Sequence, residues 1–240
     1  NEGMDKNHNP EFTMLEYYST YNDINDMITF TEQMLKDVAT KISSDSKFSF
    51  SSKTINFNKK FIINNFFDIL NEKSNHDFRK STKMEMFNTL KKDNISLDEN
   101  VSKGTMLDKA FSHYVEPTLI QPTFVINYPL CLSPLAKKTI KNNDLVDRFE
   151  LFIGGMEVAN AFTELNDPVD QRERLEEQAK LRKSGDDEAQ SLDEDFIESM
   201  ECGMPPTAGV GIGIDRLVML FTEQTSIKDV ILFPALKNND

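Results

Sequence analysis

Residues 148–157 have the sequence RFELFIGGME, which predicts two antiparallel strands joined by a tight turn. Gly154-Gly155 suits a two-residue hairpin loop because glycine accepts the positive φ angles that such a loop requires. With this loop, Glu157 faces Phe152 across the two strands. Glu157 therefore lies on the same side of the sheet as Glu150 and diagonal to it.

Helices and strands alternate irregularly around this hairpin. Apolar residues spaced by three, four and seven predict an amphipathic helix that ends at Ile42, with Asn22 or Asp23 as its N-cap. Further expected elements are a hairpin from 47–51 and 54–58, helices near 64–72, 81–92 and 105–115, a buried strand at 122–126, the long hairpin over 147–164 and a charged helix starting at 167–168. Because no βαβ rhythm is present, we expect an α+β fold in which helices flank an antiparallel sheet.

The composition is that of a globular, acidic protein. The 240 residues carry 27 Lys and Arg against 40 Asp and Glu, and the net charge of −13 argues against binding a polyanion by bulk charge. Two cysteines, Cys131 and Cys202, are too few and too far apart for a disulfide framework or a zinc site.

No apolar run approaches the roughly 20 residues that span a bilayer. The sequence starts at Asn1 without a starter methionine or a signal peptide, so we expect part of a longer soluble protein from a reducing compartment.

The hairpin carries two acids that suit a metal ion. Diagonal neighbours on one face of a sheet lie about 7 Å apart, so the carboxylates of Glu150 and Glu157 can converge on one hard cation. The alternative is two unrelated acids on a solvated face, each with its own lysine.

A second polar set follows on the same strand. Asn160, Phe162 and Glu164 alternate, but strict period-two counting puts them on the face opposite Glu157. All of these side chains can line one pocket only if a one-residue β-bulge lies near Val158-Ala159. We therefore predict that bulge.

Residues 209–216, GVGIGIDR, place glycine at every second position of an expected strand. They match neither a dinucleotide-binding fingerprint nor a phosphate-binding Walker loop. Alternate glycines clear one face of a strand, so that a flat ring can lie against the backbone. Arg216 then lies in the first turn of a helix, a suitable place for binding phosphate. Tight packing of a helix against the glycine strand is the alternative.

Residues 8–18, HNPEFTMLEYY, combine aromatic and acidic side chains. A strand that begins at Glu11 has on one face Phe12, Met14, Glu16 and Tyr18. An apolar ring and a thioether beside a carboxylate and a phenol suit a ligand that has a flat ring and a distant cation. The alternative is an aromatic core face with Glu16 tied to a buried arginine.

Together these stretches resemble the class II aminoacyl-tRNA synthetases. Residues 1–3 with 8–13 resemble the later part of motif 2, and 209–216 resembles motif 3. Features similar to the lysyl-tRNA synthetases in particular are Tyr128-Pro129, Ser133-Pro134-Leu135-Ala136, the hairpin 147–167 and Leu232-Phe233-Pro234-Ala235. The resemblance covers 1–42 and 104–237.

The resemblance implies that 1–240 is the C-terminal part of a class II catalytic domain, with an α+β fold. Within it, 1–18 is the second half of motif 2, 147–167 is the metal and amino-acid hairpin and 209–221 is motif 3. An Asn- and Lys-rich stretch over about 43–103 is expected to be a divergent surface subdomain. Motif 1, an N-terminal anticodon-binding barrel and the motif 2 arginine are expected upstream, so we expect 1–240 alone to be an incomplete enzyme.

The resemblance also implies roles for individual residues. Residues implied to bind ATP are Glu2, His8, Asn9, Phe12, Gly211, Gly213 and Arg216. Residues implied to bind lysine are Glu16, Tyr18, Asn160, Phe162 and Glu164. Glu150 and Glu157 are implied to hold Mg²⁺ against the ATP phosphates. The lysine assignment agrees with simple chemistry, because a buried carboxylate and a phenol can replace the water around an ammonium group.

The implied function is lysine–tRNA ligase: ATP activates L-lysine to lysyl-adenylate, and the lysyl group passes to the 3′ end of tRNA(Lys). The implied protein is a homodimer, located in the cytoplasm or in an organelle and without a membrane anchor. Three alternatives stay open: an aspartate or asparagine ligase, a paralogue that lysylates a translation factor, and a catalytically silent synthetase-like domain. Glu16 and Glu164 argue against an acidic substrate, and the charged set Glu150, Glu157 and Arg216 argues against a silent domain.

Overall fold

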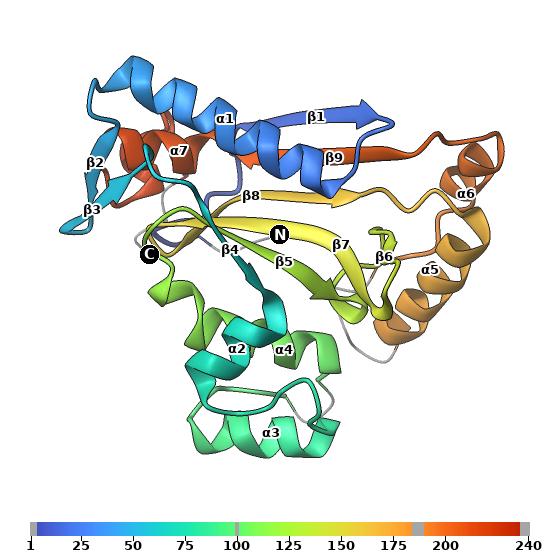
Figure 1. Ribbon diagram of the computed structural model, residues 1–240. Helices are drawn as coiled ribbons and strands as arrows, with labels where there is room; N and C mark the ends of the chain where they lie inside the picture. Colours follow the sequence, from blue (N-terminus) through green and yellow to red (C-terminus); the bar gives the residue numbers. More distant parts are fainter. Residues whose placement is uncertain (1–3, 99–100, 184–189, 236–240) are drawn as a thin grey trace.

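A seven-stranded sheet forms the centre of the computed structural model, which describes residues 4–98, 101–183 and 190–235 (Figure 1). The strands are β1 (Met14–Thr20), β4 (Ile62–Asn65), β5 (Thr123–Pro129), β6 (Lys138–Thr139), β7 (Asn142–Ile153), β8 (Met156–Thr163) and β9 (Thr207–Gly213). Their order is β1-β9-β8-β7-β5-β4, and β6 pairs with β7. All pairs are antiparallel except β4 with β5. The predicted α+β fold with an antiparallel sheet is therefore confirmed, with one parallel pair at an edge.

Helices cover this sheet and its ends. They are α1 (Ile24–Ile42), α2 (Phe66–Ser74), α3 (Lys83–Lys92), α4 (Lys103–Tyr114), α5 (Pro168–Lys183), α6 (Glu194–Glu201) and α7 (Ile214–Phe221), with 3₁₀ turns η1 (Glu116–Thr118), η2 (Leu130–Leu132) and η3 (Ile227–Asp229). As predicted, Asp23 caps α1, and its carboxylate accepts a hydrogen bond of 2.8 Å from the Asn25 amide. The predicted small hairpin is β2 (Lys47–Phe50) with β3 (Lys53–Asn56). Among the described residues, no helix has the length and apolar character needed to cross a membrane.

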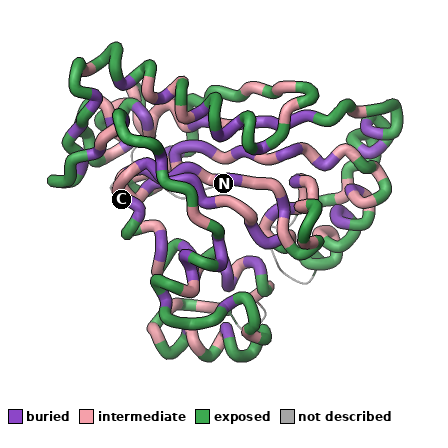
Figure 2. Tube along the Cα trace, viewed as in Figure 1, coloured by how far each residue is buried: buried purple, intermediate pink, exposed green. Residues whose placement is uncertain are grey.

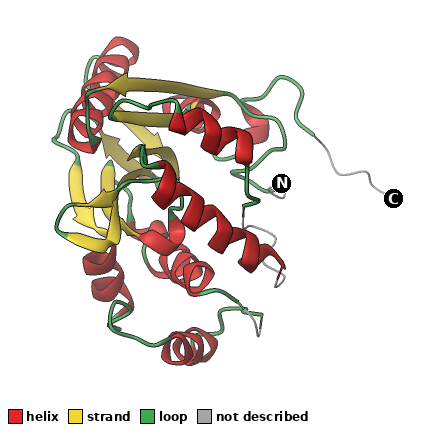
Figure 3. Ribbon diagram, turned by 90° about the vertical axis from the view of Figure 1, so that its right-hand side faces the viewer, coloured by secondary structure: helices red, strands yellow, loops and turns green. Residues whose placement is uncertain are grey.

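Two hydrophobic cores lie on opposite faces of the sheet, and Figures 2 and 3 show helices on both sides of the buried strands. One core joins the sheet to α1, α7 and the β2–β3 hairpin. The other joins it to α2, α3 and α4. Alternation along β5 places Phe124 in the first core and Val125 in the second, as the two-residue period of a strand requires.

The β7–β8 hairpin contains the predicted bulge. Glu157 pairs with Phe152, as the two-glycine turn implies, but the next pair joins Ala159 to Leu151. Val158 is therefore the extra residue on β8. Beyond it, Asn160 pairs with Glu150, so the polar side chains on either side of the bulge share one face of the sheet.

One expectation about the first strand is wrong. β1 begins at Met14 rather than at Glu11. Residues 5–13 form a loop instead, held by local hydrogen bonds such as that from the Asn9 side-chain amide to the Glu11 carbonyl (2.6 Å). Phe12 consequently reaches the site from a loop and not from the sheet.

The packing of α1 on the sheet predicts a large difference between two positions of this helix. Leu35 is 1% exposed, whereas Val38 is 38% exposed. Leu35→Ala is expected to lower the free energy of unfolding by about 2–5 kcal/mol, because it leaves a cavity against the strands. Val38→Ala is expected to change it by no more than about 0.5 kcal/mol. Urea denaturation of both variants tests this, and equal losses would show that α1 does not pack as described.

Candidate active site

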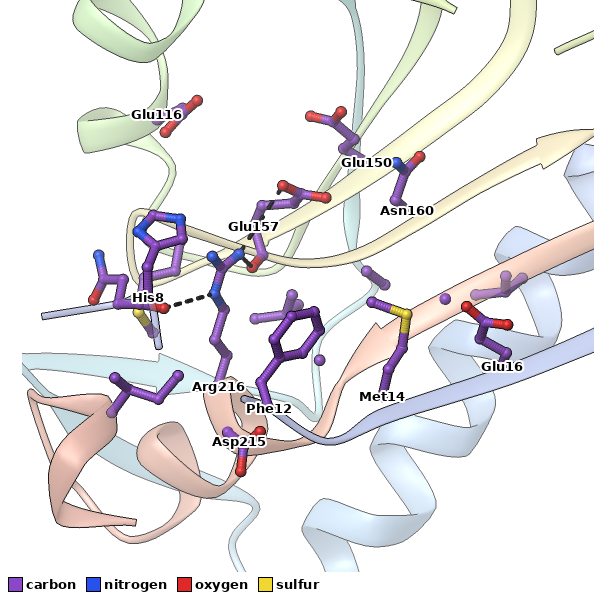
Figure 4. A pocket seen from close by; sticks show the side chains of 18 of the residues that line it. His8, Phe12, Met14, Glu16, Glu116, Glu150, Glu157, Asn160, Asp215 and Arg216 are labelled. Atoms are coloured by element: carbon purple, nitrogen blue, oxygen red, sulfur yellow. Dashed lines mark hydrogen bonds and ion pairs between the residues drawn. The ribbon is translucent and has the colours of Figure 1, made fainter. Parts of the chain in front are cut away.

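A cavity of about 580 Å³ opens on the face of the sheet opposite α1 (Figure 4). One register row runs across its floor through four strands, from Glu16 on β1 to Gly211 on β9, Asn160 on β8 and Glu150 on β7. The predicted site residues that line the cavity are His8, Asn9, Phe12, Glu16, Tyr18, Glu150, Glu157, Asn160, Phe162, Glu164, Gly211, Gly213 and Arg216. Glu2 lies outside the described residues.

The glycines of β9 give the cavity its floor. A Cβ atom on Gly209 would lie 2.5 Å from Glu164 Oε1 and 2.6 Å from Tyr18 Cε1, and one on Gly211 would lie 3.2 Å from the Met14 sulfur. The space left by the missing side chains is thus filled by residues of the cavity and not by a packed helix. The alternative of a helix packed against the strand does not apply at Gly209 and Gly211, and the role of a binding floor stays a prediction.

At one end of the cavity, acidic and phenolic groups lie together over Gly209. Burial raises the pKa of Glu164 to about 7. Burial, Glu16 and Glu164 all raise the pKa of Tyr18, so its hydroxyl stays protonated. Phe12 and Tyr18 are 55% and 64% exposed, which excludes the alternative of an aromatic core face. This end of the cavity suits a cation.

At the other end, Glu150 and Glu157 lie near Arg216 (Figure 4). Glu157 opens only partly to solvent, and burial together with the negative charge of Glu150 raises its pKa to about 8. Nη1 of Arg216 lies 4.0 Å from Glu157 Oε2 and donates a hydrogen bond of 2.6 Å to the Glu157 carbonyl. The idea that each acid has its own lysine is wrong, because Glu150 and Glu157 contact arginines.

A pair of carboxylates that resists losing both protons fits a hard divalent cation, which neutralises both charges. Within the described residues, no group of three His, Cys, Asp or Glu side chains is arranged to hold a metal ion. A metal ion held by Glu150 and Glu157 would therefore need further oxygen ligands from a substrate or from water, as is common for Mg²⁺.

The loop over 5–13 is fixed against α7. Asp215 accepts a hydrogen bond of 2.5 Å from the Thr13 amide, and Nε of Arg216 donates one of 3.4 Å to the Asn7 carbonyl. The imidazole Nδ1 of His8 lies 2.8 Å from a carboxylate oxygen of Asp5. These contacts hold His8 and Phe12 at the rim of the cavity (Figure 4).

The structure adds residues that the sequence analysis did not identify. Asp108, Ser112 and Glu116, from α4 and η1, form a further wall of the cavity. Ser112 donates a hydrogen bond of 2.6 Å to Glu116, whose pKa is raised by burial. No local pattern marks these residues, because only the packing of α4 brings them to the site.

Arg148 and Tyr128 also belong to the residues that the sequence analysis did not assign to the site, and both bind the Glu150 carboxylate. The Tyr128 hydroxyl donates a hydrogen bond of 2.7 Å to Glu150 Oε2, and Arg148 donates to Oε1. Burial raises the pKa of Tyr128 well above its usual value, so it remains a donor. Arg148 stands two positions before Glu150 on β7, so period-two counting from Glu150 could have identified it.

Known proteins resemble this chain over almost its whole length. The family description "tRNA synthetases class II (D, K and N)" matches residues 1–237. The lysine–tRNA ligase of Enterococcus faecalis is 46% identical over 99% of this chain and 48% of that protein. Those of Leuconostoc mesenteroides and Christiangramia forsetii are 47% and 45% identical over 99% of this chain, and over 48% and 42% of their own lengths.

The chain thus spans about half the length of the curated relatives that it matches. The family match extends over nearly the whole chain, and the glycine floor, the paired carboxylates and the arginine at the start of α7 lie within it. The chain belongs to the class II tRNA synthetases of the D, K and N group.

Proposed function

We propose that the protein is a lysine–tRNA ligase and that this chain carries the site where lysine is activated. The observation that carries the proposal is the charge arrangement of one cavity: Glu164 and Tyr18 at one end, and Arg216 with two carboxylates at the other. A substrate with an ammonium group fits the first end, and a metal-bound triphosphate fits the second. The names of the relatives support the same assignment.

On the proposed ATP side, Phe12 would stack on the adenine ring, and the floor of Gly211 and Gly213 would let the ring approach the backbone. Arg216 would bind a phosphate from the first turn of α7. Asp215 and Arg216 also hold the loop that carries His8 and Phe12, through hydrogen bonds with the Thr13 amide and the Asn7 carbonyl. Asn9, which is 6% exposed, would fix that loop, and Glu2 is proposed to act on the same side.

On the proposed lysine side, Glu164 and Tyr18 would replace the water around the side-chain ammonium. The raised pKa of Glu164 supports this, because a neighbouring cation recovers the energy that burial of the carboxylate costs. Glu16 would add a second negative charge, and Phe162, which also lines the cavity, would pack along the aliphatic part of the ligand. Asn160, in the middle of the floor, would meet the substrate carboxylate.

In the proposed reaction, the lysine carboxylate attacks the α-phosphorus of ATP, the bond to the β-phosphate oxygen breaks, and pyrophosphate leaves with the bond electrons. The attacking carboxylate is already ionised at neutral pH, so no side chain needs to remove a proton. The chain contributes orientation and charge neutralisation, which are the main sources of acceleration for phosphoryl chemistry. Mg²⁺ held by Glu150 and Glu157 would supply charge neutralisation on the phosphates.

Several broader features belong to the same proposal. The chain would be the C-terminal part of the catalytic domain, with the divergent subdomain at about 43–103, in a cytoplasmic homodimer. The adenylate would pass its lysyl group to the 3′ end of tRNA(Lys).

Amino-acid-dependent exchange of pyrophosphate into ATP tests the proposal in the intact protein. We expect exchange with lysine, little with aspartate, asparagine or β-lysine, and a loss of at least about 100-fold in Glu164→Gln at subsaturating lysine. That loss is the order expected for an ion pair with a partly buried carboxylate. Preference for β-lysine would indicate the translation-factor paralogue, and absence of exchange with every amino acid would refute the enzyme assignment.

Substitutions at two glycines of β9 test whether the two halves of the cavity bind different substrates. Gly209→Ala places a methyl group against Glu164 and Tyr18, so it is expected to raise the KM for lysine while leaving the KM for ATP nearly unchanged. Gly211→Ala contacts Met14 and is expected to do the reverse. Steady-state exchange assays with one substrate varied at a time measure both constants. Identical effects of the two substitutions would contradict the division of the cavity.

The pKa of Glu164 predicts how lysine binding depends on pH. Below about pH 7 its carboxyl is protonated and cannot pair with an ammonium group, which stays charged up to about pH 10. Lysine affinity is therefore expected to rise by about tenfold between pH 6 and pH 8. Titration calorimetry without ATP measures this rise. The same series on Glu164→Gln should be flat, and a slope that survives the substitution would assign the titration to another group.

A further inference from the structure

Arg148 lies beneath the cavity, with only 14% of its side chain exposed, and touches both halves of the site. Its Nε donates a hydrogen bond of 3.1 Å to Asn160 Oδ1, and its Nη2 donates to Glu150 Oε1. Its Nη1 donates to the Leu132 carbonyl and the Ser133 hydroxyl, each at 2.8 Å. One planar guanidinium thus connects the proposed metal end and the proposed amino-acid end.

The contact with Arg148 decides which atoms Asn160 offers to a ligand. Because Asn160 Oδ1 accepts from Arg148, the NH₂ group is the part of this cavity-lining side chain that stays available to a ligand. In the described part of the chain, no hydrogen bond donated by the side-chain NH₂ group of Asn160 is found. Two N–H donors are therefore left to meet an acceptor such as a carboxylate.

The same guanidinium fixes the direction of Glu150. Arg148 binds one carboxylate oxygen and Tyr128 the other, while the ring of Tyr128 lies under the guanidinium with 4.7 Å between Cζ and the ring centroid. The Glu150 carboxylate is held in this way on both sides, so its remaining lone pairs have a set direction. Such support is known to tune carboxylates that bind metal ions.

We propose that Arg148 is a positioning residue that couples the two half-sites: it holds Asn160 as a donor for the substrate carboxylate and Glu150 as a metal ligand. The inference rests on the proposed function, because it assumes that an amino acid and metal-bound ATP occupy the cavity together. A lysine side chain at position 148 cannot replace the arginine, because its single ammonium group lacks the planar set of donors that bonds Asn160 and Glu150 at once.

The test compares Arg148→Lys with the wild-type intact protein in the pyrophosphate exchange assay. Loss of the contact to Asn160 is expected to raise the KM for lysine about tenfold, and loss of the contact to Glu150 to raise the Mg²⁺ concentration for half-maximal rate by a similar factor. The matched control is Arg174→Lys. The Arg174 side chain is 8% exposed, against 14% for Arg148, and it pairs with Asp170 and the Ala136 carbonyl, neither of which lines the cavity.

A double substitution separates positioning from general damage. In an Asn160→Ala background, Arg148→Lys should leave the KM for lysine within about twofold of the single Asn160→Ala variant, while the shift in Mg²⁺ dependence persists. Additive effects on the KM for lysine would overturn the coupling through Asn160. Thermal unfolding of every variant measures the loss of stability. If Arg148 had a purely structural role, its substitution would lower stability without changing the KM for lysine or the Mg²⁺ dependence.

The outcomes also separate this inference from the proposed function. If the wild type shows lysine-dependent exchange but Arg148→Lys changes only the amount of folded protein, as Arg174→Lys does, the inference is wrong and the function stands. If the wild type shows no exchange with any amino acid, the function is refuted and the inference falls with it.

Discussion

The β-bulge at Val158 is the constraint on which the site depends. A regular ladder would send Glu157 to one face of the sheet and Asn160 with Glu164 to the other. The extra residue brings them to one side, and burial of the Val158 side chain in the core shared with α1 and α7 holds the bulge in place. Everything proposed about the cavity follows from this register, because ATP and lysine can react only if their binding groups share a face.

A second constraint is the concentration of acidic groups in the cavity. Burial raises the pKa values of both Glu157 and Glu164, so these two groups resist being ionised. A cationic ligand at each end would offset the cost of burying these carboxylates. ATP is itself an anion, so it fits a cavity of this kind only together with a divalent cation and the guanidinium of Arg216. The two ends of the site therefore suit different cations: an ammonium group at one end and a divalent metal ion at the other.

Much of this arrangement was predictable from the sequence because it is local. The two-glycine turn fixes the pairing of Glu157 with Phe152, the cap at Asp23 starts α1, and chemical consistency of the polar residues required the bulge. The missed features depend on tertiary contacts. The wall that contains Glu116 is brought to the site by α4. Hydrogen bonds within the loop before β1 make this strand begin at Met14 rather than at Glu11. Neither leaves a periodic signal.

The most direct test of the central claim is a crystal structure of the intact protein with lysine, Mg²⁺ and a non-hydrolysable ATP analogue. The account predicts both ligands in one cavity, with the lysine ammonium within hydrogen-bonding distance of Glu164, the metal on Glu150 and Glu157, and a phosphate on Arg216. Lysine bound outside this cavity, or with its ammonium group on the carboxylate pair, would contradict the account.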